Sequence, residues 1–383
     1  MMNTYVFMLI VLCIVFIIQW NLVYQSFQDK GRVDDNVMLW YFNNNHHGNR
    51  TVYRTKASAG EHHQHEYSIN NDPNLQRNGS ATSITSNSAS RRHGSNRTAA
   101  MCIMVKDEER YLKEWILYHL GLGFDHVYIY DNSNVTNKVQ TWLKQQQLSY
   151  LNEKTTIHPF HNKYVKSRQV MANMNCVKKH KDKYTWIAFF DVDEFLVLYK
   201  HETVVELLEE HLCCNGSLGI NWINFGTSNH TSSSSMPVTQ RFLYSYEKPG
   251  HIKTIVYTPD FISMRSPHWA ALRDNDQRWD TDGNFIRGQY NKDAGVHNPT
   301  FHPNGPMDVA VLHHYRVKSL EEYNWKTCAR GRAWHDKRDG NFLTKRCQNT
   351  TLQLSDLPSG QTYDDSAWKL YQKNVLSLDK AAK

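Results

Sequence analysis

One run of apolar residues that ends in carboxylates constrains the fold of this chain most strongly. Residues 186–195 read WIAFFDVDEF, and no polar residue interrupts the apolar run before Asp191. A strand without polar alternation is typical of a parallel sheet that is covered by helices on both faces. Such sheets bind their ligands at the carboxyl ends of the strands. We therefore expect a ligand site where this strand ends.

The two aspartates of this stretch predict a site for a divalent cation. Side chains alternate along a strand, so Asp191 and Asp193 point the same way if the strand continues through them. Mg²⁺ or Mn²⁺ held by one or two carboxylates keeps its other positions for water and phosphate oxygens. The alternative is that both acids only form a turn or a helix cap. An EF-hand is excluded because Leu196 stands where that loop requires glycine.

The N-terminal part of the chain predicts a membrane anchor followed by a polar stem. Residues 1–28 carry no charge, and the segment 5–24 is almost entirely apolar. We interpret 1–4 as a short cytoplasmic tail and 5–24 as an uncleaved signal-anchor helix, with a cleaved signal peptide as the alternative. Residues 25–98 are rich in Asn, Ser, His and Gly and predict a disordered stem.

Glycosylation signals and cysteines predict on which side of the membrane the body lies. Seven Asn-x-Ser/Thr sequons follow the apolar segment, which favours a luminal body and a single-pass type II topology. Beyond the segment 5–24 there are six cysteines, a number that can pair in an oxidising compartment. Cys328 with Cys347 is the best local pairing, whereas Cys102 sits in an apolar strand and reads as a core residue.

Residues 99–195 alternate between strand and helix patterns. An apolar strand at 101–105 precedes a helix whose apolar positions, from Leu112 to Leu120, recur at helical spacing. A second strand at 127–130 then runs into Asp131, and the pattern predicts a βαβ unit with acids at both strand ends. No Gly-x-Gly-x-x-Gly or P-loop motif follows any strand, so a metal is expected to hold the phosphates of a nucleotide ligand. We predict an α/β fold with a mostly parallel sheet flanked by helices.

Six motifs follow one another along the chain. They are VKDEERYLxEW at 105–115, YDNS at 130–133, FDVDEF at 190–195, WxxFGTSxH at 222–230, KTIV at 253–256 and HHYRxKSxEE at 313–322. Taken in this order, they resemble glycosyltransferase family 92 and related family 2 enzymes. The resemblance covers about residues 100–335 and implies a single GT-A (Rossmann-like) catalytic domain at 99–335, with 336–383 as a C-terminal extension. It also implies a metal-dependent, inverting transfer of a sugar from a nucleotide donor.

The resemblance assigns roles to particular residues. Asp191 and Asp193 would bind Mn²⁺ (or Mg²⁺), with His314 as the third metal ligand; a pair of ordinary buried histidines at 313 and 314 is the alternative. The same comparison places five residues at the nucleotide-sugar. These are Glu108, Asp131, Asp191, Arg316 and Lys318.

The catalytic base is less defined than the metal site. Inversion needs a carboxylate beside the acceptor hydroxyl, and Glu247, Asp276, Asp280 and Asp282 are all available. We retain Glu247 and Asp280 as candidates. Where relatives have Lys-Asn-Glu this chain has Lys106-Asp107-Glu108, so one edge of the nucleotide pocket is expected to differ.

Together these observations predict a Golgi-type hexosyltransferase that moves a sugar from a UDP-sugar donor to a glycan acceptor. The resemblance points to galactose as the sugar. Two other functions are open: a catalytically silent, glycan-binding membrane glycoprotein of the same fold, and a metal-dependent phosphohydrolase. The paired acids argue against the first, and the absence of a dense His/Asp ligand set argues against the second. A formal charge of +7, scattered along the chain, gives no indication of nucleic-acid binding.

Overall fold

The computed structural model describes residues 97–160, 167–273, 277–291, 296–298, 300–330 and 352–381. All of them belong to one compact unit, residues 89–383. The predicted tail and anchor, and the predicted stem as far as residue 96, lie outside the described residues. Among the helices that are described, none combines the length and the apolar character needed to cross a bilayer.

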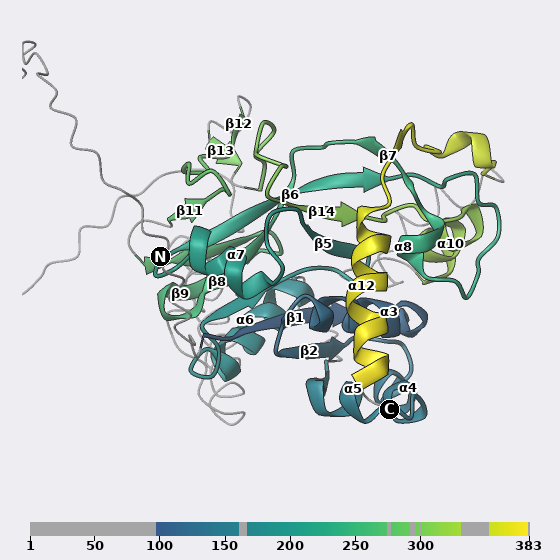
Figure 1. The fold of residues 1–383 in the computed structure, drawn as a ribbon, viewed down its shortest axis with the longest axis horizontal. Coiled ribbons are helices and arrows are strands. Elements are labelled where there is room, and N and C mark those ends of the chain that lie inside the picture. The colour runs from purple at the N-terminus through teal and green to yellow at the C-terminus, as the bar shows by residue number, and fades with distance from the viewer. Residues whose placement is uncertain are drawn as a thin grey trace, which may run out of the picture. The chain divides into compact units, whose positions relative to one another are not determined.

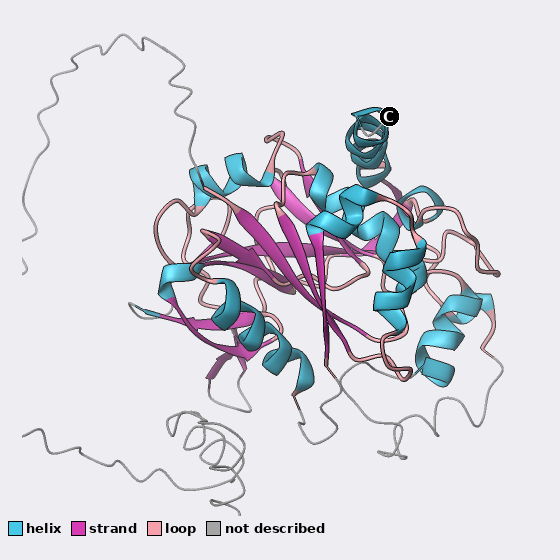
Figure 2. Cartoon of the chain, turned by 90° about the horizontal axis from the view of Figure 1, so that it is seen from below, coloured by secondary structure: helices cyan, strands magenta, loops and turns pink. Residues whose placement is uncertain are grey.

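A parallel four-stranded section forms one part of the central sheet, as the sequence predicted. Its order is β4-β1-β2-β3, and β1 pairs in parallel with both β2 and β4. Helices lie on both sides of the twisted sheet (Figures 1 and 2). The strands are β1 (Ala99–Val105), β2 (His126–Asp131), β3 (Thr155–Pro159) and β4 (Trp186–Ala188).

Strand β1 is buried on both faces, which explains its unbroken apolar sequence. Its residues 99, 101, 103 and 105 pack in one cluster with the apolar face of helix α3 (Glu109–Gly121). Residues 100, 102 and 104 pack on the other face, in a second cluster with helix α6 (Arg168–His180). Since successive strand residues point to opposite faces, every position of this strand must be apolar.

The rest of the sheet is mixed, with both parallel and antiparallel pairs of strands. Strand β8 is antiparallel to both β4 and β6, and β7 and β15 continue the edge beyond β6. Strand β14 pairs in parallel with β6 and antiparallel with β5. These strands are β5 (Glu194–Leu198), β6 (Ser217–Phe225), β7 (Tyr244–Glu247), β8 (Ile252–Tyr257), β14 (Ala310–His314) and β15 (Thr362–Tyr363).

The stretch 186–195 is not one strand, which corrects the sequence-based prediction. Strand β4 ends at Ala188, and β5 begins at Glu194 after a turn at residues 192–193. The backbone N–H of Asp191 donates to Glu194 Oε2 over 2.8 Å, so the acids shape this turn. Asp191 and Asp193 therefore do not share one face of a continuous strand, and their positions must be read from the turn.

The segment that was predicted as a C-terminal extension is packed on this same unit. Helix α12 (Ser366–Ala381), yellow in Figure 1, packs against α3, and Ala367 and Val375 are core residues. Residues 358–359 accept backbone hydrogen bonds from Thr227 and Ser228. This approach requires Gly226, because a Cβ there would lie 2.5 Å from the carbonyl oxygen of Pro358.

Two disulfides are present among the described residues. Cys102 on β1 is a core residue, as predicted, and it also forms a disulfide with Cys176 on α6, which the sequence did not indicate. Cys213 pairs with its neighbour Cys214. The predicted partner of Cys328, Cys347, lies outside the described residues.

The remaining elements are short helices and peripheral strands. The helices α7 and α10 begin with capping boxes, Thr203 with Glu206 and Ser319 with Glu322. The elements are α4 (Lys138–Gln145), α5 (Ser149–Lys154), α7 (Val204–His211), α8 (Val238–Arg241), α10 (Leu320–Asn324), the 3₁₀ helices η1 (Thr258–Asp260) and η3 (Leu354–Asp356), the π-helical segment η2 (Trp325–Arg330), and the strands β9 (Phe261–Ser266), β10 (Trp269–Leu272), β11 (Arg278–Trp279), β12 (Gln289–Asn291) and β13 (Val296–Asn298).

Candidate active site

A pocket of about 380 Å³ opens where strands β1, β4 and β14 end. This is the edge at which open α/β sheets bind ligands, as the sequence predicted. Acidic and basic side chains both line it, so the pocket offers carboxylate ligands for a cation and positive charges for a phosphate group. The lining residues are Met104, Glu108, Gln169, Asp191, Val192, Asp193, Trp222, His251, His314, Arg316, Lys326 and Arg330.

Asp191 is held by two neighbours at the edge of the pocket. Its Oδ2 accepts a hydrogen bond from Lys253 Nζ at 2.8 Å, and its Oδ1 accepts one from Gln169 Nε2 at 2.6 Å. Lys253 is fully buried on β8 and lies 3.5 Å from Glu194 Oε2 as well. Burial would lower the pKa of Lys253, but Asp191 and Glu194 outweigh it and raise that pKa. Lys253 is therefore charged and contacts Asp191 directly.

Asp193 is more deeply buried and faces three nitrogen atoms. Its Oδ2 lies 2.5 Å from Lys326 Nζ and 3.8 Å from Lys318 Nζ, and its Oδ1 lies 3.8 Å from His314 Nε2. Burial would raise the pKa of Asp193, but Lys326 and Lys318 hold it well below its usual range. The two ammonium groups therefore favour the ionised form of Asp193.

His314 is fixed by a chain of hydrogen bonds that defines its tautomer. Asn224 Nδ2 donates to Glu247 Oε2 over 3.1 Å, which leaves Asn224 Oδ1, 3.0 Å from His314 Nδ1, to accept. His314 Nδ1 therefore carries the proton. Burial lowers the pKa of His314 to about 3, so the ring is neutral and Nε2 turns a lone pair toward Asp193.

These atoms meet the chemical requirement for a hard divalent cation, although not all three predicted ligands converge. His314 Nε2 and Asp193 Oδ1 are both lone-pair donors 3.8 Å apart. Adjacent ligands of one octahedral Mg²⁺ are about 2.9 Å apart and opposite ligands about 4.2 Å apart, so the observed separation lies within about 1 Å of either arrangement. Asp191 does not complete a cluster within 4.8 Å, because in the part of the chain that the structure describes only His201, Glu210 and His211 form one.

The other predicted donor-site residues divide into two groups. Glu108 and Arg316 line the pocket, and Glu108 is ion-paired with Arg330. Asp131 and Lys318 do not line it. Asp131 is buried and accepts from the backbone N–H groups of Ser133 and Val139, so it forms the turn after β2. Lys318 is buried, and its Nζ donates to Tyr315.

The two candidate bases lie in different surroundings. Asp280 is away from the pocket lining; its Oδ1 accepts from the backbone of Asp282 and Asn284, and its Oδ2 pairs with His302. These contacts give Asp280 a loop-forming role, so its position does not support the prediction of a base. Glu247 does not line the pocket either; it is exposed at the end of β7 and linked to His314 through Asn224. Asp276 lies outside the described residues.

Sequence reasoning gave no role to several residues of this site, among them Lys253 and Lys326. Lys253 had a signal: a lysine inside the strand sequence IKTIVY is rarely buried unless it is paired. Lys326 had none, because its partner lies 133 residues earlier in the chain.

Comparisons with known proteins place the chain in a family. A glycosyltransferase family 92 protein of rice is 27% identical over 165 residues, which cover 43% of this chain and 27% of the rice protein. One of Ricinus communis is 30% identical over 165 residues, covering 40% and 28%. The chain thus matches just over a quarter of the length of these relatives. Among solved structures, Staphylococcus aureus TarS in complex with UDP aligns at 12% identity and a TM-score of 0.28, over 42% of this chain and 47% of that one.

The family assignment rests on a match to most of the described unit. The sequence model of glycosyltransferase family 92 matches residues 97–341, which contain both aspartates of the turn, His314 and the lysines beside them. The chain therefore belongs to glycosyltransferase family 92.

Proposed function

We propose that this protein is an inverting glycosyltransferase that moves a hexose, in our proposal galactose, from a UDP-sugar to a glycan acceptor. One observation carries the proposal: the pocket joins a buried, ionised carboxylate to a neutral imidazole and to Arg316, Lys326 and Arg330 on one wall. A nucleotide diphosphate needs this combination, because its charge is neutralised by cations while it leaves.

Different residues of the protein would bind the diphosphate and accept the proton of the acceptor. Arg316 and Lys326 would bind the diphosphate oxygens and stabilise the charge that develops when the bond to the sugar breaks. Glu247 would accept the proton of the acceptor hydroxyl while the hydroxyl oxygen bonds to the anomeric carbon. The hydrogen bond from Asn224 to Glu247 would orient this carboxylate relative to His314.

Mn²⁺ (or Mg²⁺) is the proposed cofactor, with Asp193 and His314 as its ligands. Asp191 is proposed as the third ligand from the family resemblance alone, because its carboxylate does not join the other two within 4.8 Å. When bound, the cation would neutralise the diphosphate leaving group. Lys326 competes for Asp193 Oδ2, so the cation and this ammonium are expected to exchange places on one carboxylate.

The activity is tested by a donor screen. The full chain is incubated with Mn²⁺ and a panel of nucleotide-sugars, with and without a mixture of glycan acceptors, and the release of free nucleotide is measured. We expect one UDP-sugar to give acceptor-dependent release. Binding of acceptor glycans without release from any donor would instead identify a silent glycan-binding protein.

Replacement of His314 tests the metal assignment separately from turnover. We expect His314→Ala to weaken Mn²⁺ and UDP-sugar binding together by at least about tenfold, because a ligand and its orientation by Asn224 are both lost. Isothermal titration of each ligand is the measurement. His313→Ala is the matched control: His313 lies 3.2 Å from Asp364, away from Asp193, so its loss should lower stability and spare metal affinity. Unchanged Mn²⁺ affinity in His314→Ala would remove His314 from the site.

We also propose a Golgi membrane location, single-pass type II, with the catalytic unit in the lumen and the segment 5–24 as anchor. The sequon residues Asn134, Asn215 and Asn229 are exposed, as acceptors of glycans must be, and the two disulfides suit an oxidising compartment. Protease added outside sealed microsomes should spare the catalytic unit, and glycosidase should lower its mass. Digestion of that unit in intact vesicles would contradict the luminal assignment.

A further inference from the structure

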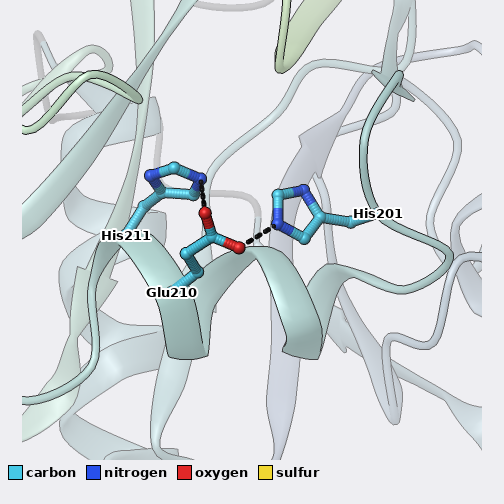
Figure 3. A group of neighbouring side chains, drawn as sticks. All are labelled: His201, Glu210 and His211. Carbon is cyan, nitrogen blue, oxygen red and sulfur yellow. Dashed lines mark hydrogen bonds and ion pairs between the residues drawn. The ribbon is translucent and has the colours of Figure 1, made fainter. Parts of the chain in front are cut away.

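Helix α7 ends in a group of three potential metal ligands that the active site does not use. Glu210 and His211 are its last two residues, and His201 lies in the loop before it. Figure 3 shows the carboxylate of Glu210 between the two imidazole rings. The ligand atoms of all three residues lie within 4.8 Å of one another.

The spacing of these atoms lies near that of the ligands of one tetrahedral ion, with His201 held to Glu210 by a hydrogen bond. His201 Nε2 lies 2.9 Å from Glu210 Oε2, and His211 Nε2 lies 3.6 Å from Glu210 Oε1. Bonds of about 2.0–2.1 Å around tetrahedral Zn²⁺ separate neighbouring ligand atoms by about 3.4 Å, and these two distances bracket that value. Two imidazoles and one carboxylate are also the ligand set of open zinc sites that keep a fourth position for water.

One atom of the group has a position that a hydrogen bond does not explain. His211 Nε2 is buried and has no hydrogen-bond partner among the described residues, although it faces Glu210 Oε1. A buried polar atom without a partner costs free energy, typically about 1–3 kcal/mol. A cation bound between the nitrogen and the carboxylate would satisfy this atom.

Local charge favours a cation at this place. The C-terminal end of α7 carries partial negative charge from its free carbonyl groups. Lys200 is the opposing charge nearby, and its ammonium is already paired with Asp308 at 2.6 Å.

We infer that His201, Glu210 and His211 form a Zn²⁺ site that fastens the loop before α7 to the end of this helix. The side chains of His201 and His211 are 8% and 13% exposed, whereas that of Glu210 is 65% exposed. The ion would thus enter from the Glu210 side. The site is independent of the proposed transferase reaction, because none of its residues lines the active-site pocket.

Zinc stoichiometry tests this inference. The full chain, purified without a histidine tag and freed of metal by chelator and dialysis, is titrated with Zn²⁺ against a chromogenic competitor. No reductant is added, because the thiolates of Cys213 and Cys214 would otherwise bind zinc. Glu210→Gln and His211→Ala remove one ligand each, and Glu209→Gln, the adjacent acid on the same helix, is the matched control.

We expect the parent and Glu209→Gln to bind one more equivalent of Zn²⁺ than the two ligand variants. Loss of an outer partner of a metal ligand costs about 10–100-fold in affinity, so loss of a ligand should cost at least as much. Zn²⁺ should also raise the Tm of the parent more than that of Glu210→Gln. Because the side chain of Glu210 is exposed, this variant is expected to fold like the parent, so the difference in Tm would report zinc binding. Equal stoichiometry in the parent and Glu210→Gln, or loss of the equivalent in Glu209→Gln, would overturn the site.

Discussion

Asp193→Asn is expected to lower kcat on the order of 100-fold or more while leaving the fold intact. The change removes one charge from the carboxylate that faces His314, Lys318 and Lys326, but it keeps the size of the side chain. Because charge stabilisation in a water-poor site is worth about 100- to 1000-fold per group, the loss should appear in turnover. Nucleotide release is the assay, and circular dichroism checks the fold.

Treatment with a chelator distinguishes whether Asp193 acts through Mn²⁺ or through its ion pair with Lys326. If Mn²⁺ acts at this carboxylate, excess chelator should reproduce the loss in the parent enzyme, and added Mn²⁺ should restore turnover. If Lys326 alone balances Asp193, the parent should keep its activity in chelator and only Asp193→Asn should be inactive. Asp182→Asn, an exposed aspartate outside the pocket, is the control and should retain full activity. Full activity of Asp193→Asn would exclude the carboxylate from catalysis altogether.

The parts of the fold that sequence predicted correctly are those that depend on local pattern. Strand β1, helix α3 and strand β2 follow from apolar spacing within about 30 residues, and the structure confirms all three. The position of the pocket also followed, because acids after parallel strands meet at one edge of a sheet. His314 next to Asp193 was a prediction from family resemblance, and the two side chains do lie together.

The details that sequence missed depend on partners far away in the chain. Asp191 and Glu194 form a turn instead of continuing a strand, with the buried Lys253 as their common partner. Nothing near residue 191 encodes a lysine 62 positions later. Cys102 likewise reads as a core residue until α6 brings Cys176 to it from a separation of 74 residues. The position of Asp131 away from the pocket lining has another reason: an aspartate at a strand end can form the turn there as readily as it can bind a ligand.

The largest loss of stability is expected from breaking the ion pair between Arg241 and Glu322. The two guanidinium nitrogens lie 2.9 and 3.0 Å from the two carboxylate oxygens, and the side chains are 2% and 1% exposed. Glu322 also caps α10 through Ser319 and accepts from Tyr111. Removing one partner of a buried pair leaves an uncompensated charge, so Arg241→Met should lower the free energy of unfolding by about 3–5 kcal/mol.

The pH dependence of stability gives a second readout of the same pair. Burial would raise the pKa of Glu322, but the hydrogen bonds from Arg241 and Ser319 outweigh it and hold the pKa at about 2, below the ordinary 4.5. A lowered folded-state pKa stabilises the protein above pH 4.5, and this contribution is lost as the pH falls from 4.5 toward 2. Urea unfolding of Arg241→Met should therefore depend less steeply on pH in this window than unfolding of the parent.

Two further variants separate the pair from general effects of substitution. Lys200→Ala breaks an exposed pair, with Lys200 and Asp308 54% and 66% exposed, and should change stability far less than Arg241→Met, because solvent screens the two charges. Arg241→Met with Glu322→Gln removes both charges and should recover part of the loss, because no unpaired charge stays buried. Since Glu322 lies on α10, which ends at Asn324 directly before η2 with Lys326 and Arg330, the single variant should also weaken UDP-sugar binding. A loss of stability no larger than that of Lys200→Ala would mean that solvent reaches Glu322 and that the pair does not anchor the wall of the active site.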